Sequence, residues 1–182
     1  MFTEYSMLDT GDLAEFFGFT EDEVKMLCAE YDMNYEEAKR WYDGYGLVEH
    51  NRHGNIKYSI YSPKSLVEAM LKHRFGTYWN QTETYEALKK YIQMDMNGLK
   101  NDIIKMLAGE KVRINTGTFS NDMTTFATKD DILTLLVHLG YLTYDSEMES
   151  VSIPNSEVSQ EYINAISTMD WKNVIESVDE SR

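Results

Sequence analysis

The segment from Lys129 to Ile166 most constrains the fold, because two helical patterns enclose a hairpin pattern with almost no linker. Apolar residues at 132, 135, 136 and 139 follow one helix face, which predicts a helix over 129–139 that ends at Gly140. Two short strands are predicted at 141–144 and 151–153.

A second helix is expected after Pro154, with either Asn155 or Ser156 as its N-cap. Its inward positions are Val158, Tyr162, Ile163 and Ile166. A helix, a two-stranded wing and a helix make up half of a winged-helix module. We therefore predict a winged-helix-like region over residues 96–182.

Upstream, a helical lobe with a small hairpin is predicted over residues 1–95. Helices are expected to begin after Thr20 and Asn34, each followed three residues later by a glutamate. Strands at 47–50 and 56–61 are predicted to pair. A further helix is expected after Ser62, with an inner stripe of Leu66, Val67, Met70 and Leu71. The predicted fold class is mainly α with small β-hairpins, an α+β arrangement.

The formal charge of −14 is unevenly distributed along the 182 residues. Residues 1–49 hold 13 acids and 3 bases, residues 50–115 hold 6 acids and 11 bases, and residues 116–182 hold 12 acids and 3 bases. An acidic surface repels phosphate, so only the middle third is electrostatically suited to meet an anion.

A cytoplasmic protein without a membrane partner is expected from three further observations. No apolar run approaches the roughly 20 residues of a membrane span. The first residues lack a signal-peptide pattern. The lone cysteine, Cys28, falls on an inner helix face, which indicates a small buried side chain.

Familiar catalytic motifs are missing from the sequence. There is no glycine-rich phosphate loop, no nucleophile elbow and no His-Glu-x-x-His pattern. His50 and His53 have a metal-compatible spacing without further ligands, so exposed loop histidines are the preferred interpretation. His138 is expected at the surface and His73 at a helix end. Asp43, Glu36 and Glu37 are interpreted as a solvated cluster.

Basic residues in the middle third are interleaved with aromatic ones, a pattern typical of single-strand binding. The candidate anion-contacting residues are Lys72, Arg74, Lys89 and Lys90. The wider set adds Lys100, Lys105, Lys111 and Arg113, with Tyr78, Trp79, Tyr85 and Tyr91. Tyr85 and Tyr91 also occupy inner helix positions, so a core role is the alternative.

Five strings together resemble one family. They are Phe17–Val24 (FGFTEDEV), Trp41–Tyr45 (WYDGY), Ile60–Val67 (IYSPKSLV), Asn101–Gly109 (NDIIKMLAG) and Leu133–Leu142 (LTLLVHLGYL). The chain resembles the central part of bacterial predicted AAA-ATPase-like proteins, which usually end in a PD-(D/E)xK nuclease-like domain. Two departures are the 46–60 segment, which is longer here, and Ser62, which stands where the family commonly has Asn.

The resemblance implies a non-catalytic lid and winged-helix module that packs on an ATPase core or another protein surface and relays its movement. Trp41, Tyr42, Asp43 and Tyr45 are the candidate docking or relay residues. Their alternative role is to close a helix end by aromatic packing. No catalytic, cofactor or metal residue is assigned to this chain, since ATP and magnesium are implied only for a complete family member.

Two other functions remain open at this stage. The first is a winged-helix protein that binds nucleic acid, which the acidic charge disfavours. The second is a free-standing antagonist that competes with complete relatives for partner surfaces.

Overall fold

The computed structural model describes residues 6–51, 54–79, 83–94, 96, 98–119 and 126–167. Within these ranges the chain combines helices with two three-stranded antiparallel sheets, which confirms the predicted α+β class. None of the helices described there has the length and apolar character needed to cross a bilayer.

The first part of the chain builds a small sheet with helices at one end. Its elements are η1 (Gly11–Phe16), β1 (Phe19–Thr20), α1 (Glu21–Glu30), α2 (Tyr35–Tyr42), β2 (Tyr45–Asn51), β3 (Gly54–Tyr61) and α3 (Pro63–Lys72). The strand order is β1-β3-β2. The hairpin pairs from Tyr45–Ile60 to Asn51–Gly54, so it is longer than the predicted strands, because backbone pairing continues through polar residues.

The second part has the order of a winged helix. Its elements are α4 (Glu83–Gln93), α5 (Leu99–Leu107), β4 (Val112–Arg113), η2 (Thr116–Thr118), α6 (Lys129–His138), β5 (Thr143–Asp145), β6 (Ser150–Ser152) and α7 (Ser156–Ser167). The strand order is β4-β6-β5, so the wing hairpin pairs with the strand that follows α5. We call α5 to α7 the winged-helix region.

Side-chain caps set the helix starts that the sequence indicated. The Thr20 amide and hydroxyl both donate to the Glu23 carboxylate at 2.8 Å, and Asn34 accepts from the Glu37 amide at 3.0 Å. Gly140 adopts the predicted left-handed conformation, with φ of +80°. These local predictions are confirmed because the caps need only neighbouring residues.

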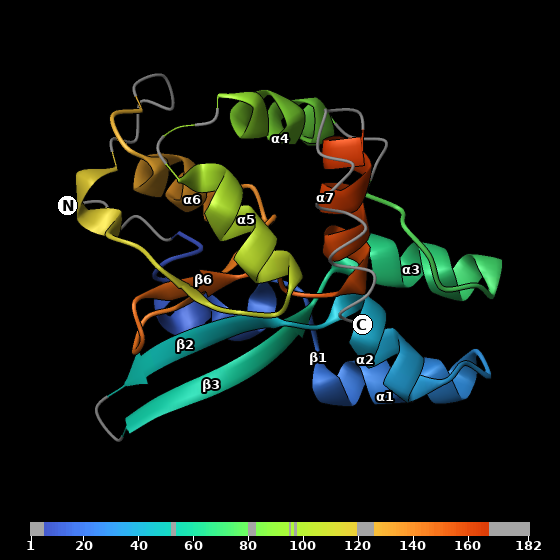
Figure 1. Ribbon diagram of the computed structural model, residues 1–182. Coiled ribbons are helices and arrows are strands. Elements are labelled where there is room, and N and C mark those ends of the chain that lie inside the picture. Colours follow the sequence, from blue (N-terminus) through green and yellow to red (C-terminus); the bar gives the residue numbers. More distant parts are fainter. Residues whose placement is uncertain are drawn as a thin grey trace.

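Figure 1 shows the β2–β3 hairpin below the winged-helix region, with α1 and α2 near one end of the hairpin and α7 rising beside α5. One large core joins α4 with the winged-helix region, and a second core joins α1, α2 and α3. Leu88 and Ile92 of α4 thus pack with residues beyond the predicted division at residue 95. The division itself stays a prediction.

The inner face of α3 differs from the predicted stripe. Leu66 and Met70 are buried as expected, but Val67 and Leu71 are 43% and 66% exposed. Ala69 is buried in their place. The helix packs through a narrow face, and the sequence pattern alone did not show which side of its apolar arc meets the lobe.

Burial of α6 extends far beyond one face. All seven residues from Asp131 to Val137 are buried, whereas a single apolar stripe was predicted. His138, expected at the surface, is half-buried and stacks on Phe119 with ring centroids 5.3 Å apart. The helix lies inside the larger core, so it presents no broad polar face.

Candidate functional site: the joint between the lobe and the winged-helix region

The Trp41–Tyr45 string ends α2 and leads into β2 beside the winged-helix region. Tyr42 is fully buried, and its hydroxyl bonds both the carbonyl and the amide of Gly76, at 3.0 and 3.1 Å. Asp43 is nearly buried and accepts a hydrogen bond from the Ser59 hydroxyl. The string is therefore held from both sides before it reaches the strand.

Three contacts fasten this string to the winged-helix region. The buried Tyr45 hydroxyl donates to the Gly140 carbonyl at 2.8 Å. The Asn155 side-chain amide donates to the Asp43 carbonyl at 2.8 Å. Gly44 has φ of +106°, and a Cβ there would overlap the Pro154 carbonyl. We call the contact of residues 43–46 with Gly140, Thr143, Pro154 and Asn155 the joint.

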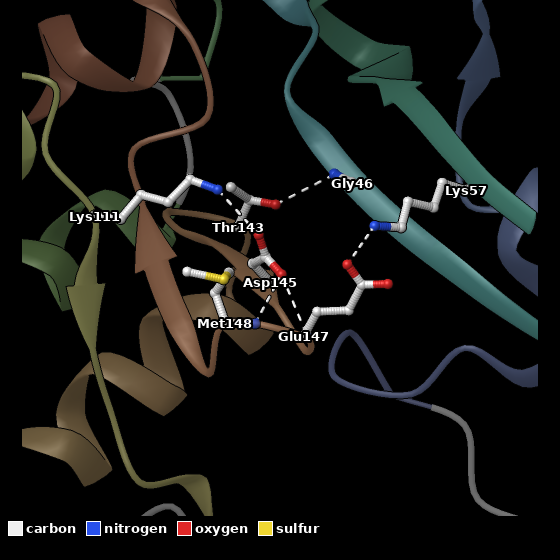
Figure 2. Close-up of polar contacts among 7 residues, drawn as sticks. All are labelled: Gly46, Lys57, Lys111, Thr143, Asp145, Glu147 and Met148. Carbon is white, nitrogen blue, oxygen red and sulfur yellow. Dashed lines mark hydrogen bonds and ion pairs between the residues drawn. The ribbon is translucent and has the colours of Figure 1, made fainter. Parts of the chain in front are cut away.

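Figure 2 shows the polar side of the joint, where the edge strands β2 and β5 face each other. The Gly46 amide donates to the Thr143 hydroxyl at 3.2 Å. Lys57 pairs with Glu147 at 2.7 Å across the gap between hairpin and wing. A cleft of about 240 Å³ lies between them.

Within the wing, Asp145 organises the turn that faces this cleft. Its carboxylate pairs with Lys111 at 3.0 Å and accepts the amides of Glu147 and Met148 at 3.2 and 3.1 Å (Figure 2). The Lys111 hydrogen bond is the main cause that lowers the pKa of Asp145 below its usual range. The charges that line the cleft are thus committed to structural pairs.

The predicted docking or relay residues are at the joint, but most of them are not at the surface. Tyr42 is fully buried, Tyr45 is 5% exposed and Asp43 is 9% exposed. Trp41 is half-buried and lies beside the Arg40 guanidinium, 6.0 Å from its ring. A direct docking contact is therefore open to Trp41, while the relay role of all four stays a prediction.

The predicted anion-contacting residues occupy two helices that Figure 1 shows at different sides of the molecule. Lys72 pairs with Glu68 at 2.7 Å and lies over the Tyr78 ring. Lys89 is within 3.4 Å of Glu86. Arg74 and Lys90 are exposed near the ends of α3 and α4. The structure does not bring these four cations into one groove.

Other candidates have simple structural positions. Glu36 and Glu37 lie in the first turn of α2, at the opposite end from Asp43, so the three acids do not converge. Cys28 is buried, and burial raises the pKa of its thiol. His73 ends α3 in a left-handed conformation. The side chains of His50, His53 and Tyr85 lie outside the described residues.

The aromatic members of the predicted groove belong to packed surfaces. Tyr91 meets Phe126 edge to face, and Trp79 packs on Tyr141, with ring centroids 5.3 and 5.7 Å apart. Lys105 and Lys129 both pair with Asp102, which is largely buried. No group of three or more His, Cys, Asp or Glu side chains is placed to hold a metal ion in the described ranges.

Sequence reasoning missed two buried acids on α7, Glu157 and Glu161. One Glu157 oxygen accepts the backbone amides of Tyr78 and Trp79, at 2.6 and 3.1 Å. Glu161 is fully buried, and both of its carboxylate oxygens lack a hydrogen-bond partner among the described residues. Burial, with a smaller effect from the charge of Glu157, raises the pKa of Glu161 to about 7.

Comparison of the chain with protein-family models, curated proteins and solved structures finds no match. The resemblance to AAA-ATPase-like proteins therefore remains an expectation.

Asn155 gives a direct test of how strongly the joint is fastened. Its side-chain oxygen caps α7 by accepting the Val158 amide at 3.0 Å, while its nitrogen holds Asp43. We expect Asn155→Ala to lower the free energy of unfolding by about 1.5 kcal/mol, measured by urea denaturation. Asn155→Ser keeps a capping oxygen and loses only the contact with Asp43, so about half of that loss is expected. Equal stability of Asn155→Ser and the parent protein would show that the contact with Asp43 contributes nothing.

Proposed function

We propose that the chain is a non-catalytic lid and winged-helix interaction module of an AAA-ATPase-like protein. The main support is the joint, in which one buried string connects the end of α2 to Gly140, Pro154 and Asn155 of the winged-helix region. A displacement of the helical lobe is transmitted through this string to the wing. Such a module acts by contacting two states of a partner unequally.

The chemistry of the polar cleft supports a structural role. Among the described residues around it, Lys57 pairs with Glu147 and Lys111 pairs with Asp145, so these acids and bases neutralise one another. General acid–base chemistry needs groups held apart in pKa within reach of a substrate. The arrangement at this cleft therefore favours binding and support of shape over reaction.

The nucleic-acid alternative has less support from the geometry. A winged helix that reads DNA places the exposed side of its recognition helix in the major groove. Here the corresponding helix, α6, is buried from Asp131 to Val137, and Asp130 and Asp131 occupy its first turn. Phosphate repulsion at that end adds to the cost of approach.

The proposal is tested by nucleotide binding and ATP turnover with the purified chain. We expect no turnover above the buffer blank and no saturable binding of ATP with magnesium. Clear hydrolysis that persists through further purification would overturn the proposal. In the same preparation, duplex and single-stranded DNA are expected to show no mobility shift at low salt, and a salt-sensitive shift would favour the nucleic-acid alternative.

A further inference from the structure

We propose that η1 and the apolar pocket beside it bind a partner protein through a segment in which a large apolar side chain is flanked by lysine or arginine. We call these two features together the η1 surface. The inference rests on the interaction function proposed above. It goes further, because it places the contact and states the chemistry of the partner.

The exposed part of this surface is a group of large apolar side chains on and after η1. Phe16 is 73% exposed, Leu13 39% and Phe17 37%, while Ala14 alone within η1 is buried. Exposed aromatic side chains that lie close together are unfavourable in water and mark contact surfaces on soluble proteins. Three of the large apolar side chains exposed in the described part of the chain thus fall within five residues.

The second part is a pocket of about 190 Å³ that Phe17 connects to this group. Its apolar lining includes Met7, Phe17, Leu47, Ile60, Trp79 and Leu139. Sites for small molecules generally begin near about 300 Å³, so this pocket is better matched to one inserted side chain. An apolar anchor in such a pocket, surrounded by contacts that exclude water, is how many protein interfaces obtain their affinity.

Charge decides what should flank the anchor. Asp12 and Glu15 are exposed and alternate with Leu13 and Phe16 along η1, and Asp9 is exposed just before it. The first 49 residues have a net charge of −10, from 13 acids and 3 bases. A segment with lysine or arginine beside its apolar anchor complements this pattern.

The same charges disfavour the other occupants. A second copy in a two-fold arrangement would bring the same acids toward each other. An anionic membrane surface would repel them. A partner segment with basic residues satisfies both the apolar and the electrostatic features of the surface.

The test begins with selection of peptides that bind the full chain from a random display library. Selected peptides are expected to share an aromatic or large aliphatic residue next to lysine or arginine. Their affinity, measured by fluorescence polarisation, should fall at least about tenfold in Phe16→Ser and Glu15→Lys and weaken as salt rises. Leu71→Ser is the matched control, since Leu71 is 66% exposed on α3, and it should bind like the parent chain. Methyl resonances of Met7 and Leu139, which line the pocket, should shift on binding.

Three results would overturn the inference. The first is that the library yields no binding peptide, or only acidic ones. The second is that the selected basic peptides bind Phe16→Ser as tightly as the parent chain. The third is a dimer of the chain in sedimentation that Phe16→Ser dissolves. These results leave the proposed module intact, because that proposal fails on ATP turnover and not on the location of a partner.

Discussion

Replacing Gly44 with alanine is expected to lower the free energy of unfolding by about 3 kcal/mol, the largest loss we expect from a single substitution in this protein. Gly44 has φ of +106°, a conformation that costs an L-residue about 1–2 kcal/mol. The added Cβ would also overlap the Pro154 carbonyl, so the lobe and the winged-helix region would have to separate locally. Urea denaturation measures the loss, and a fall in Tm of about 9 °C should accompany it.

Gly46→Ala is the control for this prediction. Gly46 lies two residues further along the chain, in β2, and its φ is not positive. A Cβ added to Gly46 would have no other heavy atom within 4 Å. Its replacement should change stability by less than about 0.5 kcal/mol. If both alanine variants unfold at the same urea concentration as the parent chain, the joint does not hold the two parts together.

The helix starts and the wing were accessible from the sequence because they depend on neighbouring residues. Thr20 with Glu23, and Asn34 with the Glu37 amide, form caps within four positions of the chain. Gly140 occupies the left-handed end that its place after an apolar stripe indicated. Local rules determine such features whatever packs around them.

The faces of helices were less accessible because burial depends on the whole fold. The pattern in α6 predicts one apolar stripe, yet Leu133 and Val137 on other sides are also buried in the large core. In α3, Leu71 is exposed although it continues the apolar arc. Periodicity reports which residues tolerate burial, and only the tertiary arrangement decides which of them are buried.

The candidate site was located by the Trp41–Tyr45 string, but its character was not. Nothing in the sequence indicates that Tyr45 reaches the Gly140 carbonyl 95 residues later, since no local rule specifies that contact. The buried acids of α7 were missed for a related reason. Glutamates four residues apart on a helix usually form a solvated face, so Glu157 and Glu161 carry no sequence signal of burial.

Glu161→Gln is expected to stabilise the protein by about 2 kcal/mol at pH 8 and to have little effect below about pH 4.5. The native pKa of Glu161 is raised to about 7 from 4.5, because a buried carboxylate without hydrogen-bond partners among the described residues resists ionisation. Such a displacement corresponds to about 3 kcal/mol, and local relaxation around the charge reduces the expected value. Urea denaturation of both proteins from about pH 4 to pH 8 measures the difference.

The pH dependence comes from the different proton affinities of Glu161 in the native and unfolded parent chain. Below pH 4.5 Glu161 is protonated in both states, so it adds no pH dependence. Between pH 4.5 and about 7 the unfolded chain releases the proton while the native protein retains it, so parent stability falls as pH rises. Above that range the native carboxylate is also ionised and the penalty is constant. Glutamine never ionises, so its advantage grows over the same interval.

Glu147→Gln is the matched control, because it removes a carboxylate that is 56% exposed and paired with Lys57. This variant should shift stability by less than about 0.5 kcal/mol at pH 8, since solvent screens exposed ion pairs. A pH-independent difference between Glu161→Gln and the parent chain would show that the Glu161 carboxylate is solvated in the native protein. A difference that grows between pH 4.5 and about 7 only in Glu161→Gln would instead assign the penalty to burial of this one side chain.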